Sequence, residues 1–152
     1  MKKLILALFT LSLVVSAFES WGGPIDEVAQ LAAQRGRVFE EGTPDAYAAA
    51  FADNGVLTAA LQAFRIEGKE AIRAYFAELF QLYPGRRIFA RQTAARAYGD
   101  DLVVQNGYFV VYFTDQNGQV AQFSFRSSTS WAKISGRWQI VDQHVSRVPM
   151  TQ

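Results

Sequence analysis

The second half of this 152-residue chain consists of four strand-like runs that are separated only by short turns. β-branched and aromatic residues fill these runs, as is typical of strands. The predicted strands span residues 86–98, 102–114, 119–133 and 137–148. Asn117-Gly118 between two such runs is the strongest short hairpin signal, so we expect consecutive strands to pair as antiparallel hairpins. The rest of the chain then has to pack on one long sheet.

Helical patterns precede this sheet. The first helix is predicted to begin at Pro24, where the missing N–H costs nothing, and to end at Gly42. The second is predicted to begin with Thr43 as its N-cap and to continue to Asn54-Gly55. Residues 56–66 read as short, broken strands.

A third helix is predicted between Glu67-Gly68 and Pro84-Gly85, with Ile72, Phe76 and Phe80 on its buried face. Helices followed by a long antiparallel sheet define an α+β fold, in which the helices cover one face of the sheet.

Composition excludes several classes of protein. A chain without cysteine cannot form a disulfide scaffold or a Cys-ligated zinc site. The formal net charge of +1 argues against a nucleic-acid partner, because such proteins gather a basic excess on one face. A chain of this length favours a single domain. No phosphate loop and no metal-ligand spacing is present, so no cofactor and no metal are expected.

Residues 1–17 match a secretory signal peptide. Lys2 and Lys3 precede an apolar run of 12 residues, from Leu4 to Val15, and Ala17 closes a small-residue cleavage site. That run is shorter than the roughly 20 residues of a spanning helix, so we expect no membrane association after cleavage. The expected product is one domain, residues 18–152, in the periplasm or secreted; an uncleaved anchor is the alternative.

The predicted strand over residues 102–114 is apolar on both faces. Val103, Phe109 and Val111 share one parity, and Tyr108 and Val110 share the other. A sheet that is apolar on both faces has to be covered on both, but the helices can cover only one. We therefore expect a homo-oligomer, a dimer or larger, that pairs through the outer sheet face.

Two stretches resemble a known superfamily. Residues 47–58, YAAAFADNGVLT, and 66–76, IEGKEAIRAYF, resemble SnoaL-like proteins of the nuclear transport factor 2 superfamily. Residues 136–149, GRWQIVDQHVSRVP, are similar to the end of bacterial relatives of the calcium/calmodulin-dependent kinase II association domain. The resemblance implies a cone-shaped, cystatin-like fold with a pocket at its open end. Its members include isomerases, cyclases, ring-forming hubs and adaptors, so the fold alone selects no function.

The chain departs from this pattern at pocket positions. Gln143 replaces the first His of a His pair, and Val145 replaces a Ser. The arginines of the kinase hub match Phe109, Thr129 and Val145 here, none of which is basic. The resemblance therefore does not carry over the hub's anion-binding pocket.

His144 is the only histidine and the obvious general acid or base. Strand alternation places Asp142 and Ser146 on its face, where the carboxylate could orient the ring. The structural alternative is a histidine that hydrogen-bonds a neighbouring strand at the sheet rim.

Arg126 lies in a polar stripe and could clamp a carboxylate or enol oxygen with its planar guanidinium. The alternative is the solvent side of the sheet or a wet subunit interface. Two-residue turns at 117–118 and 135–136 would place Arg126 with Phe109 and Gln143, and His144 with Tyr108 and Thr129. One bulge would regroup these residues, so the register stays open.

Two functions follow from these residues. The first is an exported domain that binds a small apolar or anionic ligand, self-associates as a hub, or both. The second is a cofactor-free isomerase or cyclase with His144 as the general base and Arg126 or Tyr108 stabilising an enolate. A purely assembly-forming adaptor is a third. The candidate ligand-binding residues are Arg126, Tyr108, Thr129, Asp142, Gln143 and Ser146. Tyr47, Tyr75, Phe76 and Phe80 are at core spacing and could also line an apolar pocket.

Overall fold

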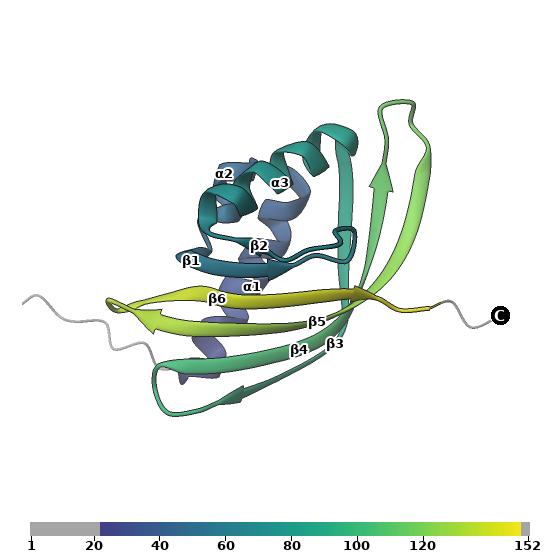
Figure 1. Cartoon of the computed structure of the whole chain (residues 1–152). Coiled ribbons are helices and arrows are strands. Elements are labelled where there is room, and N and C mark those ends of the chain that lie inside the picture. The colour runs from purple at the N-terminus through teal and green to yellow at the C-terminus, as the bar shows by residue number, and fades with distance from the viewer. Residues whose placement is uncertain (1–21, 150–152) are drawn as a thin grey trace, which may run out of the picture.

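A computed structural model describes residues 22–149, so the predicted signal peptide lies outside the described residues. These residues form three helices and six strands (Figure 1). The helices are α1 (Pro24–Glu41), α2 (Pro44–Ala48) and α3 (Lys69–Leu82). The strands are β1 (Phe51–Thr58), β2 (Ile66–Glu67), β3 (Gly85–Ala97), β4 (Leu102–Thr114), β5 (Val120–Ile134) and β6 (Arg137–Arg147).

All strands belong to one sheet in the order β2-β1-β6-β5-β4-β3. The last four strands form the predicted antiparallel meander, and β1 joins it by pairing parallel to β6. The sheet bends around the helices, and the β4–β5 hairpin rises beside the end of α3 (Figure 1). There the Gln116 side chain donates a hydrogen bond of 3.1 Å to the Gln81 carbonyl.

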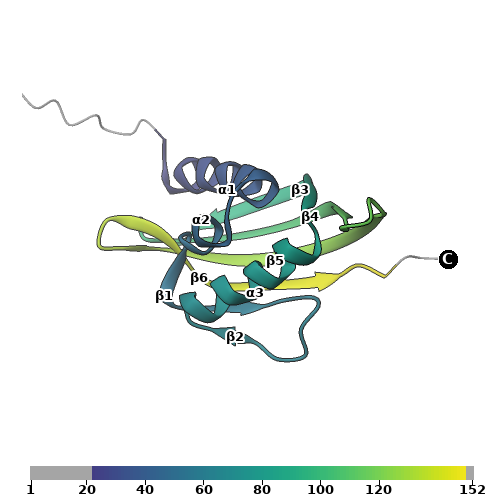
Figure 2. The ribbon, with the colours of Figure 1, turned by 90° about the horizontal axis from the view of Figure 1, so that it is seen from above.

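The helices cover the concave face of the sheet, with α1 and α3 lying over different strands (Figure 2). Their apolar faces and the inward side chains of the strands make one core, in which Val28, Ile72, Val103 and Ile140 are fully buried. The predicted α+β class and the helical cover on one face are thus confirmed. Among the described residues, no helix has the length and apolar character needed to cross a membrane.

The second helix is shorter than predicted. It begins as expected, with the Thr43 hydroxyl accepting from the Ala46 amide at 3.2 Å, but it ends at Ala48 instead of continuing to Asn54. Phe51 starts β1, pairs with Ile140 of β6 and is fully buried, and the Ile140 amide donates to the Ala50 carbonyl at 2.8 Å. Pairing with β6 therefore overrides the local helical pattern.

The register of the last three strands also differs from the one that two-residue turns would produce. Residues 115–119 connect β4 to β5. The Asp115 amide donates to the Gln119 carbonyl at 3.0 Å, which leaves three residues in the turn, with Gly118 at φ +80°, so that Arg126 lies opposite Tyr108 instead of Phe109. The turn at 135–136 does have two residues, but a bulge between Ser130 and Trp131 shifts the pairing of β5 with β6. Each shift of one residue exchanges the two faces of the sheet.

Candidate functional site

A cavity of about 590 Å3 lies between the helices and the concave face of the sheet. Its volume falls within the range of about 300–1,000 Å3 that is typical of small-molecule sites. Most of its wall is apolar, and the larger side chains come from the three helices and the inward positions of β3, β4 and β5. They include Phe39, Tyr47, Tyr75, Phe76, Leu79, Ile88, Phe109, Val111, Phe125 and Trp131.

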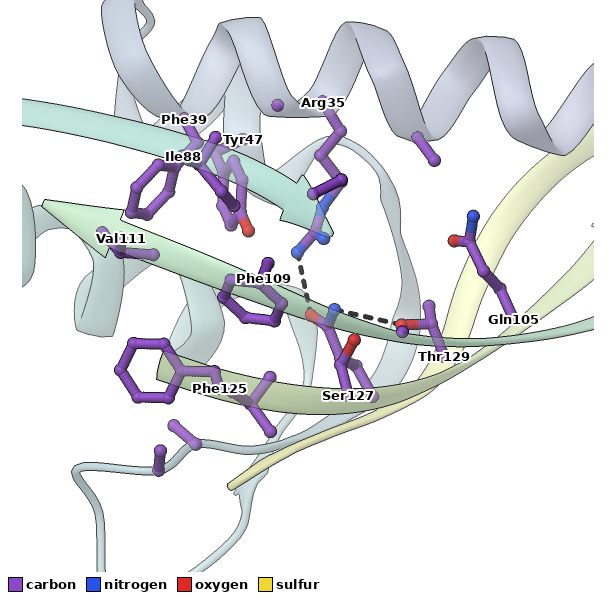
Figure 3. Close-up of a pocket in the computed structure, with 18 of the residues that line it drawn as sticks. Arg35, Phe39, Tyr47, Ile88, Gln105, Phe109, Val111, Phe125, Ser127 and Thr129 are labelled. Atoms are coloured by element: carbon purple, nitrogen blue, oxygen red, sulfur yellow. Dashed lines mark hydrogen bonds between the residues drawn. The ribbon is translucent and has the colours of Figure 1, made fainter. Parts of the chain in front are cut away.

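One charged side chain extends from the cavity wall toward the sheet. Arg35 of α1 points down from the helix toward β5 and β6, as Figure 3 shows. Its Nη2 donates to Oε1 of Gln143 at 2.9 Å, and Nε2 of Gln143 donates to the Thr129 hydroxyl at 3.1 Å (Figure 3). Because Thr129 and Gln143 are 4% and 7% exposed, this chain of hydrogen bonds is shielded from water and holds the amide in one orientation.

Aromatic rings hold the other side of the guanidinium. The Arg35 Cζ lies 4.1 Å from the ring centroid of Tyr47 and 5.2 Å from that of Phe51. A cation over an aromatic face is attracted by the ring quadrupole, more strongly when it is desolvated. These contacts fix the position of Arg35 without neutralising its charge.

The cavity has an excess of positive charge. Within residues 22–149, no carboxylate lies within 4.0 Å of Arg35, and its Nε has no hydrogen-bond partner. Glu40 is the one carboxylate among the lining residues, and it is engaged by the Ile88 amide at 2.8 Å and by Arg87 at 3.4 Å. Burial lowers the pKa of Arg35, but a guanidinium stays charged at neutral pH.

Two tyrosines contribute neutral hydroxyl groups to this wall. Burial raises the pKa of Tyr75 to about 12, and burial also raises the pKa of Tyr47. Both therefore remain protonated at neutral pH and can donate or accept a hydrogen bond. Both tyrosines pack against the core and also line the cavity, so the two roles that their sequence spacing suggested, core residue and pocket wall, apply together.

The structure separates the predicted site residues. Thr129 and Gln143 lie in the cavity wall, and Tyr108 also belongs to its lining although it is 48% exposed. The other candidates are not among the lining residues: Arg126, Asp142, His144 and Ser146.

These four residues project from the opposite, convex face. The Nε of Arg126 donates to the Ser146 hydroxyl at 3.0 Å, and both lie in register with Tyr108. His144 is exposed and lies opposite Ser128. Arg126 and His144 thus share a face with each other but not with Gln143, because the turn and the bulge changed the register.

Sequence reasoning missed Arg35. A signal was available, because Arg35 lies one turn from both Leu31 and Phe39 on the apolar stripe of the first helix. A charged residue on a core-facing stripe is unusual and indicates either a buried partner or a ligand. Among residues 22–149, no group of three or more His, Asp or Glu side chains could hold a metal ion.

The bent sheet and its helical cover have the fold of solved structures described as nuclear transport factor 2-like and cystatin-like. Residues 25–149 match the calcium/calmodulin dependent protein kinase II association domain family, and the chain belongs to that family. No curated protein matches the chain.

Solved structures agree with this assignment. A Xanthomonas campestris protein, provisionally assigned to the same association-domain family, is 25% identical with a TM-score of 0.78, covering 86% of this chain and 91% of its own. A nuclear transport factor 2-like protein of unknown function from Pseudomonas putida KT2440 is 21% identical with a TM-score of 0.72, over 83% and 87% of the two chains. A protein from Novosphingobium aromaticivorans, provisionally named a scytalone dehydratase, is 10% identical with a TM-score of 0.75, over 82% and 84%. At that identity the last two share the fold alone.

Proposed function

We propose that this protein is a ligand-binding association domain, which holds a small, largely apolar molecule in the cavity and self-associates through the convex face of its sheet. The cavity of about 590 Å3 carries the proposal. A concave space of this size with a mostly apolar wall and a few placed polar groups is the usual form of a small-molecule site.

Self-association is supported by the convex face and by the family. Phe89 and Tyr108 are each 48% exposed there, and the Phe89 ring packs against Tyr112 with centroids 5.9 Å apart. Exposed aromatic residues of this kind are enriched in protein interfaces. Membership in an association-domain family favours a second copy of this chain as the partner. Arg126 and His144 would then lie in or near the interface.

Export is part of the proposal and rests on the sequence of residues 1–17. The mature protein would begin after Ala17 and work in the periplasm or outside the cell. N-terminal sequencing of the protein recovered from the periplasmic fraction tests this point. A protein that retains Met1 in the membrane fraction would contradict it.

Native mass spectrometry of the exported protein tests binding and assembly together. We expect a dimer or larger species and an added mass of one small molecule per subunit. Two variants separate the effects: Phe89→Glu, outside the cavity lining, should release monomers that still carry the added mass, and Ala32→Phe, on the cavity wall, should remove the added mass but keep the assembly. Unliganded monomers in the wild type would overturn the proposal.

The enzymatic alternative based on His144 lacks support from the geometry. A general base has to reach the proton that it removes, within about 3 Å or through one water molecule. His144 is exposed and does not line the cavity. We therefore do not propose His144 as a catalytic residue.

A further inference from the structure

We propose that the cavity selects a monoanion, a molecule with an apolar body and a single carboxylate that pairs with Arg35. This inference rests on the proposed ligand-binding function and names the class of ligand. It follows from the charge of the cavity, from the position of Arg35 and from the apolar character of the remaining wall.

The charge of the cavity selects the sign of the ligand. Arg35 is half-buried: its Nε is shielded from water and has no partner, and its Nη2 donates to the neutral amide of Gln143. A partly desolvated cation without a carboxylate is unfavourable, and a charged partner offsets the cost of this desolvation. An anionic ligand would supply this partner.

The position of Arg35 selects a planar acceptor. A guanidinium has five N–H donors in a fixed fork, and within residues 22–149 one of them donates, to Gln143. A carboxylate can accept two parallel hydrogen bonds from the remaining donors. Tyr47 and Phe51 already hold the guanidinium in place, so binding would cost little side-chain entropy.

The rest of the wall limits the ligand to one charge. Apart from Arg35, the charged lining residues are Glu40, which is already paired, and Arg37, which is exposed. A second carboxylate on the ligand would therefore face Phe109, Val111 and Phe125 without a counter-charge. An apolar chain or ring system fits these side chains.

Isothermal titration calorimetry with two matched probes tests the inference. The probes are 2-naphthylacetate and 2-(2-naphthyl)ethanol, which share a ring system but differ in the carboxylate. A charge-assisted bidentate pair predicts that the wild-type protein binds the acid at least about tenfold more tightly than the alcohol. Arg35→Gln should reduce this ratio to about twofold or less and leave the affinity for the alcohol unchanged, because the apolar wall is intact.

Two further variants separate a specific pair from a general charge effect. Arg35→Lys keeps the charge but loses the fork, so an intermediate ratio is expected. Arg96→Gln removes the same charge from an exposed position of β3, where Arg96 donates to Asn106 at 3.0 Å, and should leave the ratio at the wild-type value. A ratio that falls equally in Arg96→Gln and Arg35→Gln would overturn the inference.

A measurement on the wild-type protein tests the inference without depending on whether any variant folds. In a 15N-labelled sample, the acid should shift the Arg35 Nε resonance and the alcohol should not. Equal binding of both probes, with no shift, would overturn the choice of a monoanion and leave ligand binding intact. Failure of both probes to bind would overturn this inference and the cavity-binding proposal together.

Discussion

The two faces of the central sheet are built from the same three strands but have opposite character. On the concave face, β4, β5 and β6 line a largely apolar cavity that contains the half-buried guanidinium of Arg35. On the convex face, the same strands present Arg126 and His144 to solvent. The comparison teaches that the side chains best suited to acid–base or anion chemistry on the strands, His144 and Arg126, lie outside the cavity. The charge of the cavity comes instead from Arg35, a residue of α1.

The largest expected difference between the faces is in stability. Trp131 is 2% exposed in the cavity wall, and Trp131→Ala should lower the free energy of unfolding by about 3–5 kcal/mol. Its neighbour Ser130 projects to the convex side, and Ser130→Ala should change that free energy by less than about 0.5 kcal/mol. Urea unfolding at one temperature measures both. Equal losses for the two variants would mean that both faces are packed in the monomer.

A smaller difference concerns hydrogen bonding. Thr129→Val keeps the shape of the side chain but removes the acceptor for the Gln143 Nε2, and should cost about 1–3 kcal/mol because the amide is buried. The matched variant Ser128→Ala lies on the other face, opposite His144, and should cost less than about 0.5 kcal/mol. Urea unfolding again gives the values. A neutral Thr129→Val would show that Gln143 finds another partner.

Much of the fold could be predicted from the sequence because its signals are local. Proline at the start of a helix, Asn-Gly in a hairpin and alternation in the strands each act over a few residues, and the bounds of α1 and β4 follow from them. The early end of α2 could not be predicted in this way. It depends on the pairing of Phe51 with Ile140, which is about ninety residues further along the chain.

The candidate site was predictable only in part, because its membership depends on register. The three-residue turn before β5 and the bulge opposite Trp131 decide whether Arg126 or Thr129 faces the helices, and neither leaves a strong sequence signal. Gln143 and Thr129 were among the candidates and do line the cavity. Arg35 was missed because it lies on a helix, whereas the candidate polar groups were sought on the strands.

Replacing Arg35 should separate stability from binding. Burial lowers the pKa of this guanidinium, so the fold already disfavours its charge. Arg35→Met keeps most of the volume but leaves Oε1 of the buried Gln143 without its donor, so it should lower the free energy of unfolding by about 1 kcal/mol while it removes selectivity for the acid probe. Calorimetric unfolding and titration with 2-naphthylacetate check the two effects. A gain of stability would show that the cost of desolvating the charge outweighs the contacts with Tyr47 and Gln143.

The smallest effect concerns the attachment of α1, the helix that carries Arg35, to the sheet. Glu27 in its first turn accepts from the Trp138 Nε1 at 2.6 Å and from Lys133 Nζ at 3.1 Å, on the β5–β6 hairpin. The hydrogen bonds from Trp138 and Lys133 lower the pKa of Glu27 below its ordinary value of 4.5. A lowered pKa in the folded state means that the contribution is complete above pH 4.5 and is lost as the pH falls through the folded value.

Glu27→Gln should therefore reduce the free energy of unfolding at pH 7 by less than about 1 kcal/mol, since the pair is partly exposed. The same variant should also show a weaker decline in stability than the wild type between pH 4.5 and pH 3, because the titrating group is gone. Urea unfolding at both ends of this range measures the slope. Parallel pH profiles for the two proteins would mean that Glu27 titrates alike in the folded and unfolded chains. In that case apolar contacts, such as those of the buried Val28, hold α1 on the sheet rather than this carboxylate.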